Sequence, residues 1–167
     1  SANVAVGYSA GSAITSGSSN TIIGYLAGDA IDTMTDNTAI GAGALGGSSA
    51  VDKTVVIGSG AGAGAMTDAA DGAILIGYAA GAALTTGNGN IAIGLNAFDD
   101  ATVPSNCVAI GTNALGAIGA GSASDNNVAI GAGAMASVDE GSHASATTQE
   151  NVAIGTNALK GADYVSA

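Results

Sequence analysis

The sequence predicts an all-β protein, a parallel β-solenoid built from nine coils of about 17 residues. The unit Asn-x-Ala-Ile-Gly-x-x-Ala recurs nine times, starting near residues 3, 20, 37, 54, 73, 90, 107, 127 and 151. Each unit places β-branched residues between Asn and Gly, which favour turns. Glycine recurs too often to leave a helix of useful length. Repeats of this period indicate stacked coils.

The repeat is strict enough to define one repeat domain over residues 1–167. The residue three places after the repeat glycine is alanine in all nine copies. The repeat glycines are Gly7, Gly24, Gly41, Gly58, Gly77, Gly94, Gly111, Gly131 and Gly155. Their spacing is 17 in most copies and rises to 24 before the last, so extra residues fall in surface spacers.

Each x-Ala-Ile triplet in turn predicts one short strand. The expected strands are residues 4–6, 21–23, 38–40, 55–57, 74–76, 91–93, 108–110, 128–130 and 152–154. One triplet buries nothing alone, but parallel stacking buries a continuous core. At a strand spacing of about 4.8 Å, the nine coils would form a rod of about 40 Å.

Both faces of these strands are apolar. Side chains alternate along a strand, so the Ile column of Val6 and Ile23 shares a face with Val4, and Ala5 and Ile22 lie opposite. A strand that is apolar on both faces is normally buried on both. We expect one face to fill the coil and the other to pack on further copies, most simply a second and a third.

A column of asparagines precedes the strands: Asn3, Asn20, Asn37, Asn90, Asn127 and Asn151. Stacked Asn side chains can hydrogen-bond along the rod and satisfy turn backbone groups. Cys107 replaces asparagine in this column and is expected to be a packed thiol rather than a nucleophile. Its one candidate base, His143, lies two repeats away.

Composition excludes several functions. The chain has two Lys, no Arg and 13 acidic residues, a net charge of −11, which argues against nucleic-acid binding and attraction to anionic lipid. Polar and Gly interruptions argue against a transmembrane helix. One His and one Cys exclude multi-His zinc ligation and an intrachain disulfide. Aromatic residues make up only 3%, so the core is expected to hold only Ala, Gly and one Ile or Val per strand.

The repeat NVAIGxxAL resembles the head repeat of YadA-like trimeric autotransporter adhesins, and similar β-roll repeats occur in bacteriophage tail fibres. The resemblance spans residues 3 to about 160. It implies a left-handed parallel β-roll assembled as a homotrimer on a cell or virion surface, without implying a ligand. The period is longer than in the bacterial heads, and the spacers ITSGSSN and LTTGNGN are more typical of phage fibres.

The longest spacer is the best candidate for a binding loop. It holds the only His and both Glu residues, and the candidate residues are Asp139, Glu140, Ser142, His143 and Thr147. A plain solvated loop is the competing interpretation. Stacked Asp and Asn oxygens could hold Ca²⁺, although the Gly-Gly-x-Gly-x-Asp repeat is absent. Tyr8, Tyr25 and Tyr78 share one repeat position, where they either pack at the edge of the roll or contact sugars.

These observations predict an extracellular fibre segment without enzymatic activity or a required cofactor. The first expectation is a phage tail or head fibre that attaches to a host glycan or protein. The alternatives are a bacterial adhesin head or a filament subunit that stacks end to end. Acidic pairs such as Asp99 and Asp100 leave one enzymatic alternative open, a depolymerase built across trimer clefts. Because the motif begins at residue 3, we expect the chain to be a segment of a longer fibre.

Overall fold

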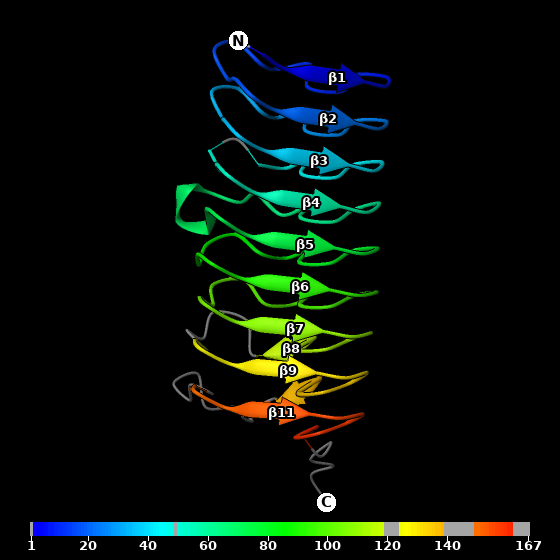
Figure 1. The fold of residues 1–167 in the computed structure, drawn as a ribbon, viewed down its shortest axis with the longest axis vertical. Helices are drawn as coiled ribbons and strands as arrows, with labels where there is room; N and C mark the ends of the chain where they lie inside the picture. The colour runs from blue at the N-terminus through cyan, green and yellow to red at the C-terminus, as the bar shows by residue number, and fades with distance from the viewer. Residues whose placement is uncertain (1, 49, 119–123, 139–148, 162–167) are drawn as a thin grey trace, which may run out of the picture.

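The computed structural model describes residues 2–48, 50–118, 124–138 and 149–161. The chain winds into a stack of coils in which the strands lie one above the other (Figure 1). The strands of the main sheet are β1 (Val4–Val6), β2 (Thr21–Ile23), β3 (Thr38–Ile40), β4 (Val55–Ile57), β5 (Ile74–Ile76), β6 (Ile91–Ile93), β7 (Val108–Ile110), β9 (Val128–Ile130) and β11 (Val152–Ile154). The predicted parallel solenoid is confirmed, with its nine strands at the expected positions.

All strands of the main sheet pair in parallel and in the register that the repeat dictates. Val4 pairs with Thr21, and Ile74 pairs with Ile91, each at the same position of the repeat. The hydrogen-bond ladder continues into the turns, where the Leu26 amide donates to the Tyr8 carbonyl at 2.9 Å. Backbone hydrogen bonds therefore connect one coil to the next around most of the circumference.

The turn after each strand depends on the repeat glycine. These glycines have φ between 124° and 142°, a region that side chains rarely tolerate. They also approach the next coil closely, because a Cβ on Gly77 would lie 2.3 Å from the carbonyl oxygen of Gly94. Both constraints explain why this position is glycine in every copy.

Two further left-handed residues complete each turn, at the second and fourth positions after the repeat glycine. In the second coil they are Leu26 (φ 53°) and Gly28 (φ 50°). In the sixth coil they are Asn96 (φ 50°) and Phe98 (φ 61°). Alternating left-handed residues fold the chain back sharply, so that the alanine between them points inward.

The core lies inside the coil and is formed by three sources of side chains. The central residue of each inner strand is buried, as is the alanine three places after the glycine in most coils. Ile31, Met34 and Leu84 close the far wall. The expectation that only Ala, Gly and one Ile or Val per strand fit inside is wrong, because Phe98 and Met135 are also fully buried. The fourth position after the glycine reaches the wide part of the coil, where large side chains fit.

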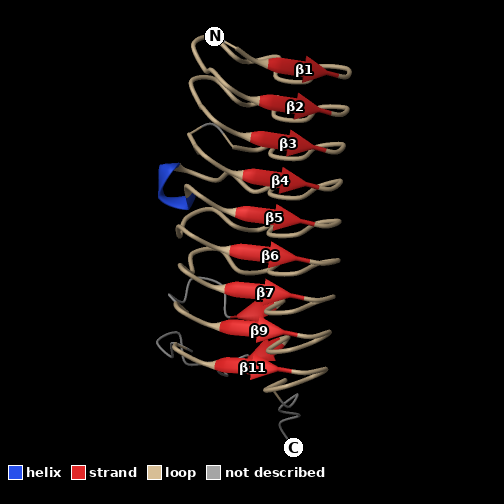
Figure 2. Cartoon of the chain, in the orientation of Figure 1, coloured by secondary structure: helices blue, strands red, loops and turns tan. Residues whose placement is uncertain are grey.

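The longer spacers form small additions outside the main sheet. The spacer after Ala65 contains the 3₁₀ turn η1 (Asp68–Ala70), capped by Thr67. The next two extended spacers begin with β8 (Ala117–Ile118) and β10 (Ser137–Val138). These two strands pair in parallel as a separate sheet (Figure 2).

Candidate functional site

The predicted binding loop cannot be located in this structure. Asp139, Glu140, Ser142, His143 and Thr147 all lie outside the described residues. The pairing of β8 with β10 shows only that the described starts of the last two long spacers are adjacent. The loop therefore stays a prediction from sequence, and the functional surfaces below come from the described coils.

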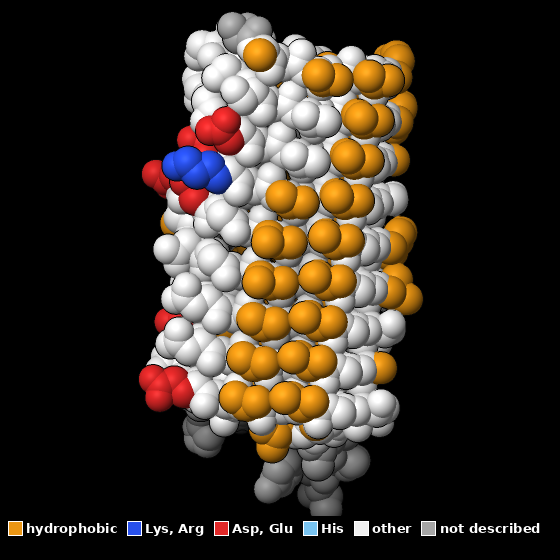
Figure 3. Space-filling model, viewed as in Figure 1, with side chains coloured by type: hydrophobic (Ala, Val, Ile, Leu, Met, Phe, Trp, Pro, Cys, Tyr) orange, Lys and Arg blue, Asp and Glu red, His pale blue; other side chains and the backbone are white. Residues whose placement is uncertain are grey.

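The outer face of the main sheet carries two largely apolar columns. The first and third residues of each strand point outward, while the central residue of all but β1 is buried. Figure 3 shows these columns side by side along the length of the rod. The outward residues are half-buried in the middle of the sheet and more exposed at its ends, reaching 68% for Ile154. The sequence indicated two apolar faces, and the structure shows that the Ile column lies outside.

The first column also contains two polar members, Thr21 and Thr38, in neighbouring strands. The second column is formed entirely of Val and Ile, from Val6 to Ile154. We call these two columns together the outer face. A face of this kind has no charged group with which to attract a charged ligand, and it is suited to contact with another apolar surface.

The asparagine column is structural, as predicted. The Asn37 side chain donates to the Val51 carbonyl at 2.9 Å, and its Oδ1 accepts from the Thr54 amide at 3.0 Å. The Asn37 amide in turn donates to Oδ1 of Asn20 at 3.0 Å. Asn37 therefore joins its own coil to the coils on both sides, and its side-chain polar atoms are occupied inside the protein.

Cys107 occupies one position of this column as a buried thiol. Its sulfur lies 3.1 Å from the Ser124 carbonyl and accepts from the Asn127 amide at 3.5 Å. Burial raises the pKa of the Cys107 thiol, an effect that the hydrogen bond from Asn127 partly opposes. A buried thiol with a raised pKa is a poor nucleophile, which agrees with the predicted packing role.

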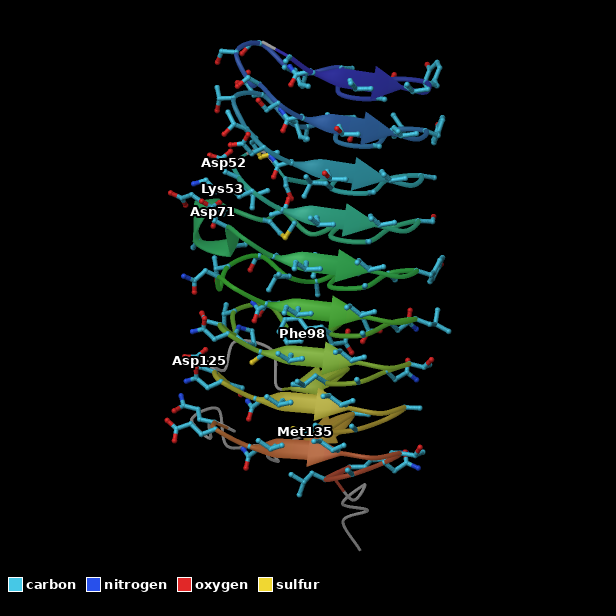
Figure 4. The ribbon with its side chains drawn as sticks, viewed as in Figure 1. Asp52, Lys53, Asp71, Phe98, Asp125 and Met135 are labelled. Carbon is cyan, nitrogen blue, oxygen red and sulfur yellow. The ribbon has the colours of Figure 1, made fainter. Side chains whose placement is uncertain are left out.

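Aspartates on one rim of the coil accept hydrogen bonds from backbone amides of neighbouring coils. Oδ1 of Asp52 accepts from the Thr35 amide at 2.6 Å, and Oδ1 of Asp71 accepts from the Asp52 amide at 2.8 Å. Asp125 accepts from the Ser105 amide in the same way, at 2.8 Å. Figure 4 shows these aspartates along one edge, with Lys53 beside the first two. We call Asp52, Asp71 and Asp125 the acidic rim.

The sequence suggested calcium binding as a role for these acids, and it did not predict their hydrogen bonds to backbone amides. The available signal was their position, two residues before the asparagine column, where Ser, Thr, Asn or Gln stands in other coils. Within the described ranges, no three side chains of the His, Cys, Asp or Glu type gather where they could hold a metal ion. In the acidic pair Asp99 and Asp100, the pKa of Asp99 is raised, first by burial and then by the neighbouring charge of Asp100.

Tyrosines lie on the turns that follow the strands. Tyr8 and Tyr25 stack, with ring centroids 5.6 Å apart and planes inclined by 17°. Both are exposed, as are Tyr78 and Leu95 at the same repeat position. We call Tyr8, Tyr25, Tyr78 and Leu95 the tyrosine rim. The predicted packing at the edge of the roll is thus seen for one pair, while most of each ring faces solvent.

Comparisons with known protein families, curated proteins and solved structures gave no match to this chain. A search of the described residues for a helix long and apolar enough to cross a bilayer found none. The functional argument therefore rests on the surfaces of the coil.

Proposed function

We propose that this protein is an extracellular structural and adhesive fibre segment, with a bacteriophage tail or head fibre as its most specific form. The observation that carries the proposal is the outer face, whose second column is Val or Ile in every strand of the main sheet and whose first column is interrupted only by Thr21 and Thr38. Such a face is costly to leave in water, because each half-exposed Val or Ile forgoes part of the roughly 1.5–3 kcal/mol that full burial contributes. Covering it would require a partner that is equally long and equally regular.

A further copy of the chain is the partner that fits this description. Its outer face has the same rung spacing and the same apolar columns, so every rung of one copy can lie against a rung of another. The resemblance of the repeat to the heads of trimeric adhesins favours a homotrimer around one axis, in which the outer faces of three copies would cover one another. The rod-long backbone ladders would then resist extension, and the rims and spacers would be left for contact with a host surface.

The oligomeric mass tests this proposal directly. Light scattering in dilute solution is expected to give about three times the chain mass of 15.4 kDa. Ile93→Lys places a charge in the middle of the outer face and should give a folded monomer. Asn88→Lys makes the same change of charge on an exposed rim residue and should leave the trimer intact. A wild-type chain that stays a compact monomer would contradict the proposal.

Stacking of copies end to end is a second candidate. Within the described sheet, β1 and β11 each pair on one side only, which leaves an edge that another chain can extend. Negative-stain images separate the two assemblies. Short rods of uniform length support the fibre segment, and filaments of increasing length support end-to-end assembly. A bacterial adhesin head would be the same trimer on a cell surface.

A further inference from the structure

The tyrosine rim is interrupted by a gap of small residues. The second and fifth coils carry Tyr25 and Tyr78, whereas the third and fourth coils carry Ala42 and Ser59 at the same position. Both small residues are exposed. Beside them, a Cβ added to Gly43 or to Gly60 would meet no atom within 4 Å. The rim is therefore open along three rung spacings, about 14 Å.

Tyr8 covers part of the Tyr25 ring and leaves the rest exposed. Tyr8 and Tyr25 stand on neighbouring coils about 4.8 Å apart along the rod, and their nearly parallel rings have centroids 5.6 Å apart. One face of Tyr25 is therefore turned toward Tyr8. Tyr25 is still 58% exposed, and the next coil along the rod carries only the small Ala42 at the same repeat position.

The rim also differs from the rest of the surface in charge. None of the residues at the first and second positions after the repeat glycine is charged, from Tyr8 and Ser9 to Leu95 and Asn96. The acidic rim lies on the other edge of the coil, before the strands. An anionic ligand would find no cation at the gap and would be repelled by the net charge of −11.

We propose that the gap between Tyr25 and Tyr78 binds a neutral pyranose unit of a surface glycan. The electron-rich face of Tyr25 would pack against the C–H face of the sugar ring, over the floor formed by Ala42 and Gly43. The exposed Ser59 hydroxyl lies on the same floor and can exchange hydrogen bonds with the sugar hydroxyls. This inference rests on the surface location given by the proposed function, but each chain carries the complete site, so self-association is not required.

Saturation-transfer NMR with neutral oligosaccharides of glucose, mannose and galactose tests the site, with alginate oligosaccharide as the anionic comparison. We expect transfer from tyrosine protons to at least one neutral probe and none to alginate. Ala42→Leu fills the gap without removing a tyrosine and should abolish the transfer. Ala132→Leu makes the same change at the same repeat position in the eighth coil, and it should leave the transfer unchanged.

The monomeric Ile93→Lys variant separates this inference from the proposed function. Binding by both the wild-type protein and this variant supports the site, whatever the oligomeric mass. Absence of transfer to every neutral probe overturns the inference, as does equal binding by Ala42→Leu and Ala132→Leu. Binding by the Ile93→Lys monomer alone also overturns it, because a second copy would then cover Tyr25 in the assembled protein.

Discussion

At the residue scale, the glycines of one coil meet different demands. Gly77 combines a φ of 138° with close contact to the next coil. Gly60, at the second position after a repeat glycine, has a φ of 66° and open space where a Cβ would lie. Other coils place Leu26 and Ala79 at this second position. Left-handed backbone alone is therefore tolerated, whereas left-handed backbone against a neighbouring coil is not.

This difference predicts unequal effects of the same substitution. Gly77→Ala should lower the free energy of unfolding by about 3 kcal/mol or more, because strained backbone and overpacking add. Gly60→Ala should cost about 1 kcal/mol, the penalty of a left-handed alanine. Urea denaturation followed by circular dichroism measures both variants. Equal losses would show that φ alone decides, and that contact between coils does not.

The asparagine column makes a second prediction at this scale. In Cys107→Asn, the new amide can accept from the Asn127 amide and donate to the Ser124 carbonyl, replacing weak contacts to sulfur. Stability should rise by about 1 kcal/mol. The reverse change, Asn90→Cys, should cost about 2 kcal/mol, because it removes hydrogen bonds to Gly87 and Pro104. A loss of stability in Cys107→Asn would mean that the site is shaped for sulfur.

The raised pKa of the Cys107 thiol has a consequence at alkaline pH. As pH rises past the ordinary thiol value of about 8.5, the unfolded chain releases this proton before the folded chain does. The unfolded state then binds fewer protons, so stability should fall with increasing pH in that range. Denaturation midpoints of the wild type and Cys107→Asn, measured across the range, should diverge. Parallel curves would place the titrating group elsewhere.

At the element scale, the second and sixth coils fill their interiors in two different ways. The second coil has Gly28 at the fourth position after its repeat glycine, and Ile31, three residues later, occupies the space, with its Cδ1 2.6 Å from where a Cβ on Gly28 would lie. The sixth coil instead has Phe98 at the fourth position and the small Ala101 three residues later, both buried. In these two coils one large side chain fills the corner, and it comes from a different position in each.

Replacing the residue pair of the sixth coil with the pair found in the second coil tests whether the two positions share one space. Phe98→Gly should cost about 4 kcal/mol through the cavity it leaves. Adding Ala101→Ile reproduces the pair found in the second coil and should recover at least half of that loss. A double-mutant cycle measures the coupling between the two positions. If the two effects simply add, the residues do not share one space.

The repeat predicted every strand of the main sheet because Asn, the β-branched pair and Gly each have a local physical reason to stand where they do. It did not predict the corners, because left-handed Leu45, Phe98 and Leu115 carry no local signal for a positive φ. The far wall was missed for a related reason. Ile31 and Met34 lie in spacers without a strict pattern, and only the closed coil brings them inside.

The candidate surfaces were predictable to different degrees. Alternation within the strands indicated the apolar outer face, but which face points outward depends on how the coil closes. The tyrosines were visible as a shared repeat position. The gap beside Tyr25 was not, because it depends on stacking that brings residues 17 apart into contact. The role of the acidic rim was not predicted. An aspartate that accepts a hydrogen bond from a backbone amide in a neighbouring coil looks the same in the sequence as a solvated aspartate.

At the scale of the whole molecule, the solenoid is a one-dimensional array in which each coil contacts its neighbours. Strand contacts link only consecutive members of the main sheet, apart from the short pair β8 and β10. Stability should therefore be close to a sum of coil and interface terms. Such an array tolerates removal of a whole coil, provided that the glycine, alanine and asparagine columns stay in register.

Deletion of residues 91–107 removes one complete coil, because Ile91 and Val108 are register partners. Asn90 would then precede Val108 directly, β5 would pair with β7, and Ala109 would take the place of Ala92. We expect cooperative thermal unfolding and a rod about 4.8 Å shorter by X-ray scattering. Deletion of residues 91–108 removes one residue more, so the asparagine and glycine columns can no longer both align, and the inward side chains of the following strand turn outward. That variant should lose cooperative unfolding; equal behaviour of the two deletions would show that the columns do not set the register.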